Sequence, residues 1–270
     1  MHFHRLLYGF SILLFFVACT TEIKLARNIQ KEKQSISVLC DYPDFLYLSS
    51  SMVAIPKGLT EDEETAFHDS LFTNSDYVRF IDDTIFFRRF RQNMKEDLES
   101  IGVKYYETDD IDAFLNSGGV QYLVNFKQLE IEERWESYHA EEVFGEMLYE
   151  EDFWIKGVSV NAWMDVAKVN DTVEIQRQLY RESVILDEVD GMFFQNQWNG
   201  EVHYQYRLDS LEVSDIGELK EQSAMEFSRF IFNYIVNKEI QDRLFYLEGL
   251  EPPNNWYISP SSGRLIPNPK

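Results

Sequence analysis

Histidine side chains are the groups in this sequence that could hold a metal ion. His68, His139 and His203 follow the N-terminal segment, and they are widely separated. His139 begins the stretch His139-Ala140-Glu141-Glu142, which lacks the second histidine that a helical zinc site requires. We therefore expect no metal site.

Carboxylate pairs and glycine-rich loops are the other patterns that identify enzymes. Glu130, Glu132 and Glu133 beside Trp135 would suit the acid and base of a glycosidase, but the chain holds 47 acidic residues and such clusters have little specificity. The 12 glycines form no phosphate-binding loop and no nucleophile elbow. The sequence thus predicts a protein that is not an enzyme, with no catalytic residue and no cofactor.

Cys19 follows an apolar run and is the cysteine with a predicted modification. Leu6 to Ala18 spans 13 residues, whereas a membrane-crossing helix needs about 20. A basic start and a small final residue are typical of a secretory signal peptide. Phe16-Val17-Ala18-Cys19 resembles the lipobox of bacterial lipoproteins. The resemblance implies a signal peptide over residues 1–18 and acyl chains on Cys19 that attach the protein to the lipid bilayer.

The alternatives to a lipoprotein signal are an ordinary cleaved leader and an uncleaved membrane anchor.

The segment from Thr20 to Lys24 lacks the aspartate of an inner-membrane retention signal and the acidic cluster of a surface-export signal. We therefore expect an anchor in the outer membrane, with the protein facing the periplasm.

The composition is strongly acidic. Without residues 1–18, the chain carries 24 basic and 47 acidic residues, a net charge of -23. This charge disfavours nucleic-acid binding, which is built from cationic contacts to phosphates, and adhesion of the folded domain to anionic lipid. An apolar content of 44% and an aromatic content of 15% exclude a chain that is disordered throughout.

The domain organisation follows from composition along the chain. Residues 19–34 are polar and predict a tether, residues 35–249 a single α/β domain, and residues 250–270 a proline-rich C-terminal tail. Strands are expected from Ser35 to Asp41 and from Phe45 to Ile55. The first contains Cys40, which we interpret as a buried thiol because no basic residue lies near it in sequence.

Helical and strand periodicities alternate next. An apolar stripe predicts a helix that Gly102 ends. A short strand, Val103 to Tyr106, and a second helix capped by Thr108 follow, with a further strand from Val120 to Phe126. The stripe of the first helix consists of Phe87, Phe90, Met94, Leu98 and Ile101, and the inner face of the second of Ile111, Phe114 and Leu115.

A long antiparallel hairpin and a last helix complete the domain. Val158 to Val169 and Val173 to Leu186 are strand-like and flank Asn170-Asp171-Thr172, a turn sequence. A helix capped by Ser214 follows. The fold class expected is α/β (α+β), a single sandwich of a mixed sheet with a long antiparallel hairpin and helices packed on one face.

Aromatic residues outside the periodic segments are the candidate contacts with a ligand or partner. Asp190 to Gly200 reads as a loop rich in Phe, Trp, Asn and Gln, which either folds onto the core or forms a contact surface, and sugar sites use the same mixture. The aromatic residues of the tail either pack back onto the domain, which we favour, or form a docking peptide. The candidates are Phe193, Phe194, Trp198, Trp256 and Tyr257.

The element order resembles that of periplasmic accessory lipoproteins, among them ABC-transport auxiliary lipoproteins and the amino-terminal domain of the Tol-system propeller protein. Because a fold does not fix a function, the resemblance assigns no residue. Our leading hypothesis is a non-catalytic, outer-membrane-anchored lipoprotein that acts as an accessory or assembly subunit of a cell-envelope complex, with an envelope protein as partner. The alternative is a glycan- or peptide-binding lipoprotein in nutrient capture.

Overall fold

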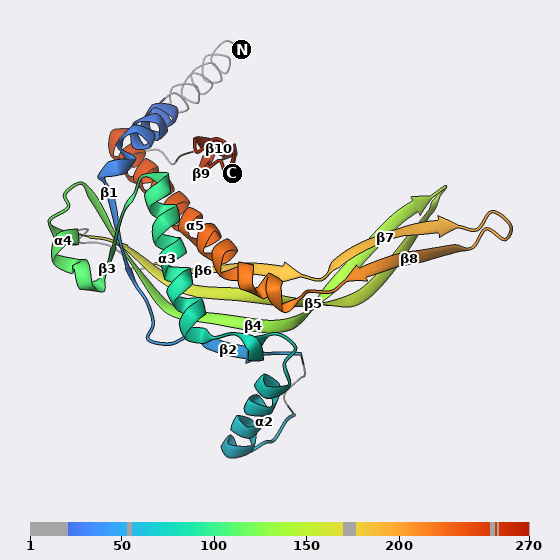
Figure 1. Cartoon of the computed structure of the whole chain (residues 1–270). Coiled ribbons are helices and arrows are strands. Elements are labelled where there is room, and N and C mark those ends of the chain that lie inside the picture. The colour runs from blue at the N-terminus through green and yellow to red at the C-terminus, as the bar shows by residue number, and fades with distance from the viewer. Residues whose placement is uncertain (1–20, 53–55, 170–176, 249–251, 253, 270) are drawn as a thin grey trace, which may run out of the picture.

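A mixed six-stranded sheet forms the centre of the molecule, with helices on one face (Figure 1). The structure is a computed structural model that describes residues 21–52, 56–169, 177–248, 252 and 254–269. The strand order is β3-β1-β4-β5-β6, and β2 pairs with β4 off this path. The predicted α/β class, with its mixed sheet, long antiparallel hairpin and one-sided helices, is confirmed.

The parallel part of the sheet is built around β1 (Ile36–Asp41), which pairs in parallel with β3 (Lys104–Glu107) and β4 (Val120–Phe144). Because β1 lies between two strands and under helices, its first five residues are buried. Parallel strands are joined by a crossover of a dozen or more residues, usually through a helix. Between β3 and β4 the chain forms the short α4 (Ile111–Leu115). β3 and β4 are therefore joined by a parallel crossover, with β1 between them.

The two helices predicted in this region are present, but their predicted inner faces agree with the structure to different extents. α3 (Asp83–Ile101) is capped by the side chain of Asp82 and ends at Gly102, whose φ of 99° is readily adopted only by glycine. Its buried face includes Phe86 rather than the predicted Phe87, which is half-buried. In α4, only Phe114 faces the core, and the predicted inner residues Ile111 and Leu115 are exposed.

Antiparallel pairing forms the other half of the sheet. β4 pairs with β5 (Met147–Lys168), and β5 pairs with β6 (Arg177–Leu186). The predicted hairpin corresponds to β5 and β6, and its turn, residues 170–172, lies outside the described residues. A bulge between Phe126 and Gln128 shifts the register of β4, so odd-numbered residues face the helices after it. β2 (Tyr47–Ser50) pairs in parallel with residues 130–133 of β4.

The helix layer consists of α3 and α5 (Val213–Glu248), which lie side by side over the sheet (Figure 1). α5 begins one residue before Ser214, so the predicted cap lies inside the helix. α2 (Glu61–Asn74) stands apart from this layer and buries no side chain. Fully buried residues of both layers form one core, the largest being Tyr122, Phe90, Phe126, Phe227 and Phe232.

Helical structure over residues 21–32 corrects the predicted polar tether over residues 19–34. Leu25, Ala26 and Ile29 are spaced for one helix face and are buried, and Glu22 is fully buried as well. The oxygen of the Gln30 side-chain amide accepts from the backbone N–H of Leu265 at 3.0 Å. This segment is thus part of the folded domain.

The C-terminal tail is also structured. β9 (Asn254–Ile258) and β10 (Leu265–Pro269) form an antiparallel hairpin that packs against α5 and the helix of residues 21–32. Trp256 and Ile258 are buried, which is the first of the two alternatives raised for the tail. Regular structure therefore continues beyond Gly249, where we expected it to end. No helix in the described ranges has the length and apolarity to cross a membrane.

Candidate functional site

Two β-hairpins leave the body of the domain together and form a projecting element, which we call the arm (Figure 1). It comprises residues 134–156 of β4 and β5, and residues 188–209, which contain β7 (Glu188–Gln195) and β8 (Val202–Asp209). β2 pairs with β4 only up to Glu133, and β6 pairs with β5 only as far as Gly157. Beyond these points β4 and β5 still pair with each other, but no other strand of the central sheet pairs with them in the described residues.

Aromatic side chains hold the two hairpins of the arm face to face. Phe153 of β5 stacks on Tyr206 of β8 with ring centroids 4.6 Å apart, and Tyr204 lies 4.8 Å from Phe193. The Tyr204 hydroxyl donates to that of Tyr138 at 3.5 Å. Partial burial raises the pKa of Tyr204 to about 12, so the phenol stays neutral. Aromatic packing of this kind gives the arm a core of its own.

Gly191 permits this packing. A Cβ atom built at this position would lie 2.1 Å from the Tyr204 hydroxyl oxygen and 3.0 Å from the Cβ of Tyr206. Only a residue without a side chain lets the two tyrosine rings of β8 lie across β7.

Two buried carboxylates fix the root of the arm. Asp187 accepts from the backbone N–H groups of Lys156 at 2.8 Å and Leu211 at 2.9 Å, which joins β5 to the segment that enters α5. Glu133 accepts from three consecutive backbone N–H groups at 3.0, 2.8 and 3.2 Å. These belong to Asp76, Tyr77 and Val78, at the start of the 3-10 turn η2 (Val78–Phe80). Such bonds satisfy buried groups and immobilise the junction.

The suggested acid–base cluster does not form a cleft. Glu133 faces the helix side of β4 and is occupied by the three N–H groups, whereas Glu130 and Glu132 lie on the other side of the strand. Glu130 accepts from the Ser49 hydroxyl at 2.7 Å, and Glu132 lies 3.6 Å from the guanidinium of Arg134. These carboxylates therefore have structural partners.

One surface of the arm carries apolar side chains at both ends and polar ones between them, and we call it the tryptophan face. It continues the helix-bearing side of the sheet, because its residues follow Ile131 and Val158 at every second position. Trp154 is 67% exposed, and the remaining members are exposed as well. The tryptophan face consists of Trp135, His139, Glu141, Val143, Leu148, Glu150, Asp152 and Trp154.

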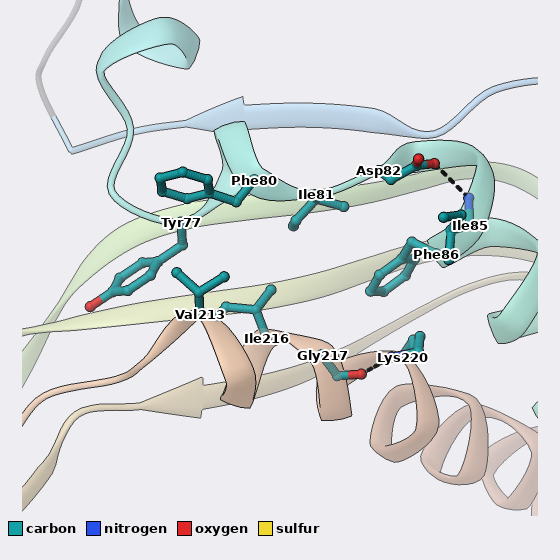
Figure 2. A pocket seen from close by; sticks show the side chains of 10 residues that line it. All are labelled: Tyr77, Phe80, Ile81, Asp82, Ile85, Phe86, Val213, Ile216, Gly217 and Lys220. Atoms are coloured by element: carbon teal, nitrogen blue, oxygen red, sulfur yellow. Dashed lines mark hydrogen bonds between the residues drawn. The ribbon is translucent and has the colours of Figure 1, made fainter.

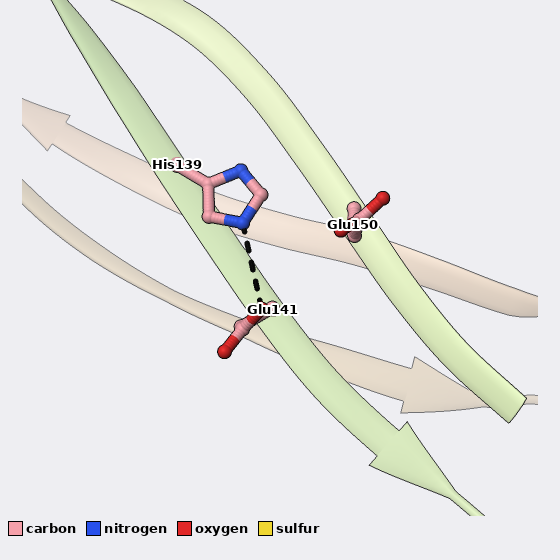
Figure 3. A group of neighbouring side chains, drawn as sticks. All are labelled: His139, Glu141 and Glu150. Atoms are coloured by element: carbon pink, nitrogen blue, oxygen red, sulfur yellow. Dashed lines mark ion pairs between the residues drawn. The ribbon is translucent and has the colours of Figure 1, made fainter. Parts of the chain in front are cut away.

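His139 lies at the centre of this face, between carboxylates (Figure 3). Its Nδ1 is 2.7 Å from Asp152, and its Nε2 is 3.6 Å from Glu141. The hydrogen bond to Asp152 raises the pKa of His139 above the usual 6.5, because it favours the imidazolium. His139, Glu141 and Glu150 place donor atoms within 4.8 Å of one another, a spacing that suits a metal ion, but all three are exposed. Exposed acidic groups of this kind are common without a bound ion, so the cluster alone does not define a metal site.

The predicted contact residues differ in their location and in their exposure to solvent. Phe194 is exposed on β7, and Trp198, in the turn between β7 and β8, is 98% exposed. Phe193 faces the interior of the arm, and Tyr257 is exposed on β9. Trp256 is buried, so the structure removes it from the candidate contacts. Cys19 lies outside the described residues.

Sequence reasoning missed most of the tryptophan face. Trp135 and Trp154 lie 19 positions apart in the chain, and only the pairing of Ser137 with Trp154 brings them to diagonal positions on one face. The pairing that joins them is not visible in the sequence.

An apolar pocket of about 220 Å³ opens where η2 and the starts of α3 and α5 meet (Figure 2). Its ionisable side chains have structural roles. The Asp82 carboxylate caps α3 through the backbone N–H of Ile85, and the Lys220 ammonium donates to the carbonyl of Gly217. The pocket is mainly a gap between apolar residues such as Phe80 and Val213.

Cys40 is inert. It is fully buried, as expected, and burial raises its pKa to about 12. A thiol with this pKa is not a nucleophile near neutral pH.

The comparisons with known proteins supply no family. No protein-family model matches the chain, and no curated protein matches it. The candidate site is therefore defined by the geometry of the arm alone.

Proposed function

We propose that this protein is a non-catalytic lipoprotein that acts as an accessory subunit of a cell-envelope complex and docks on its protein partner through the arm. The observation that carries the proposal is the arm itself. An exposed aromatic surface on a rigid projection is typical of an interaction site, because tryptophan and tyrosine dominate binding energies at protein interfaces. Trp198, with 98% of its surface exposed, gains no packing from its own fold.

Acylation of Cys19 supplies the location in this proposal. The helix of residues 21–32 packs on the end of the body away from the arm (Figure 1). A lipid attached at Cys19 would therefore hold the protein by one end and leave the arm free at the other. Several acyl chains together give stable attachment without a membrane-spanning helix.

Photo-crosslinking in cells tests the docking role. A photoreactive phenylalanine analogue at Trp198 should form a discrete crosslink to a protein that mass spectrometry identifies as an envelope component. The matched control places the analogue at Tyr246, which is exposed on α5 at the opposite end of the molecule. Absence of a crosslink from the arm, or the same crosslink from both positions, would contradict the proposal.

Metabolic labelling with a palmitate analogue tests the anchor. The natural protein should be labelled, and Cys19→Ser should abolish the label and release the protein from membranes. Label that persists in Cys19→Ser would remove the lipid anchor from the proposal.

A further inference from the structure

The tryptophan face is a sheet face whose covering layer stops at the root of the arm. In the body, α3 and α5 cover the helix-bearing side of the sheet, and neither extends over the arm (Figure 1). Trp154, Val143 and Leu148 are consequently exposed, although they continue the rows of buried residues on β4 and β5. A partner that binds here would extend the layer that covers the same side in the body.

The arm carries a strong negative charge. Residues 134–156 and 188–209 include 11 acidic and 3 basic residues, a net charge of -8 with histidine neutral. On the tryptophan face itself, Glu141, Glu150 and Asp152 lie between the apolar side chains at its two ends. The field of these carboxylates attracts a cationic partner and repels an anionic one.

One cation of the chain already occupies the edge of this face. The Nζ atom of Lys156 lies 5.6 Å from the centre of the Trp135 ring and pairs with the carboxylate of Asp76. An ammonium held between an indole and a carboxylate is stabilised by both. Trp154, with Asp152 and Glu150 on the same strand, repeats this combination of groups further along the arm.

The same charges argue against two other occupants. A second copy of the chain would bring a second arm of charge -8 against the first. An anionic bilayer surface would repel the arm in the same way. Both would have to overcome the repulsion with apolar contacts alone.

We infer that the tryptophan face binds an extended protein segment that presents both basic and apolar side chains on one side. An extended segment places every second side chain on one side, about 7 Å apart, which matches the spacing along the strands of the arm. Basic side chains pair with the carboxylates and the indole rings, and apolar ones contact Val143 and Leu148. The inference rests on the proposed function and specifies the chemistry of the partner surface.

The probe is a labelled octapeptide of sequence Val-Ser-Lys-Ser-Lys-Ser-Val-Ser, which places its lysines and valines on the same side when extended. Fluorescence anisotropy measures its affinity for the full-length protein purified from membranes in non-ionic detergent. The comparison peptides replace each lysine by glutamine or by glutamate. We expect the lysine peptide to bind at least about tenfold more tightly than either, with an affinity that falls as salt rises.

Charge reversal provides a matched pair of variants. Glu141 and Glu150 lie opposite each other in register, so Glu141→Lys with Glu150→Lys keeps a pair of like charges at that position. Glu61→Lys with Glu64→Lys on α2 makes the same change in net charge away from the arm. The first pair should weaken binding about tenfold, and the second should change it less than about twofold.

Tryptophan substitutions test the aromatic contribution. Trp154→Ala should weaken binding about fivefold, whereas Tyr246→Ala, which removes an exposed ring from α5, should leave it unchanged. Equal binding of the lysine and glutamine peptides, or equal losses in both charge-reversal variants, would overturn the inference. A crosslink from the arm together with such a result would leave the proposed function standing, whereas loss of the crosslink would remove the proposed function itself.

Discussion

Replacing Trp256 by Phe should destabilise the domain, because this side chain joins the two ends of the described chain. The indole Nε1–H donates to a carboxylate oxygen of Glu22 at 2.8 Å, and both residues are buried. Phenylalanine retains much of the apolar contact but has no donor. Within the described part of the chain, the Glu22 carboxyl would then keep the bond from the Asn254 amide at 2.9 Å.

The expected loss follows from the two changes. A buried acceptor that loses its partner costs about 1–3 kcal/mol. The smaller ring removes a few buried atoms and leaves part of their volume empty, which adds about 1 kcal/mol. Trp256→Phe should therefore lower the free energy of unfolding by about 2–4 kcal/mol, a large share of the roughly 5–15 kcal/mol of a typical domain.

Urea-induced unfolding followed by circular dichroism measures this change. Tyr257→Phe, in the same strand but with an exposed side chain, is the control and should stay within about 0.5 kcal/mol of the natural protein. A double-mutant cycle with Glu22→Leu should give a coupling energy of at least about 1 kcal/mol. If Trp256→Phe behaved like the control, or if the coupling were zero, residues 21–32 would not pack as described, and a tether would again be the better interpretation.

Three further substitutions test the arm and its root. Glu133→Gln replaces one acceptor oxygen by a donor in front of three backbone N–H groups, so the free energy of unfolding in urea should fall by about 1–3 kcal/mol, and no change would contradict the anchoring role. Gly191→Ala forces a methyl group against Tyr204, so hydrogen exchange of the arm amides should accelerate by an amount equivalent to about 1–3 kcal/mol, while equal exchange rates would refute the close packing. Asp152→Asn should lower the pKa of His139 towards 6.5 in an NMR titration. Because the folded-state pKa is raised, protonated His139 stabilises the fold fully below about pH 6.5, and this contribution is lost as the pH rises through the folded-state value; a pKa that is the same in the variant would show that Asp152 is not the cause.

The parallel half of the fold was predictable because its signals are local. The alternation from Val120 to Phe126 contrasts apolar and polar neighbours, and the stripe ending at Ile101 has helical spacing followed by Gly102. Each pattern arises from one buried face and one solvated face. Tertiary contacts then select details that periodicity leaves open, such as Phe86 rather than Phe87 on the inner face of α3.

The arm was not predictable as a unit, for two physical reasons. The bulge after Phe126 changes which residues face the helices, so the strand pattern of β4 breaks in the sequence although the strand continues. Beyond Glu133, both sides of the strand carry aromatic and charged residues, and the contrast between a buried and a solvated face disappears. Phe193 and Trp198 were recognised as candidate contacts from composition, but the packing of β7 and β8 on β4 and β5 depends on contacts distant in sequence.

The N-terminal segment was misjudged because few apolar residues suffice to dock a short helix. Leu25, Ala26 and Ile29 are buried and Ile23 is partly buried, in a segment that is otherwise polar. The fixed partner of Glu22 lies more than 230 positions away in the sequence. No local pattern reveals such a pairing.

The docked helix of residues 21–32 also determines how far the protein can reach. Cys19 is two positions before residue 21, so at most about 7 Å of backbone separates the proposed lipid attachment point from the folded domain. With so short a connection, the domain would stay at a nearly constant distance from the bilayer surface and could not explore the surrounding volume. Its partner would have to present the matching surface at that distance from the bilayer. A flexible insertion after Cys19 would remove this requirement, because the domain could then move relative to the membrane.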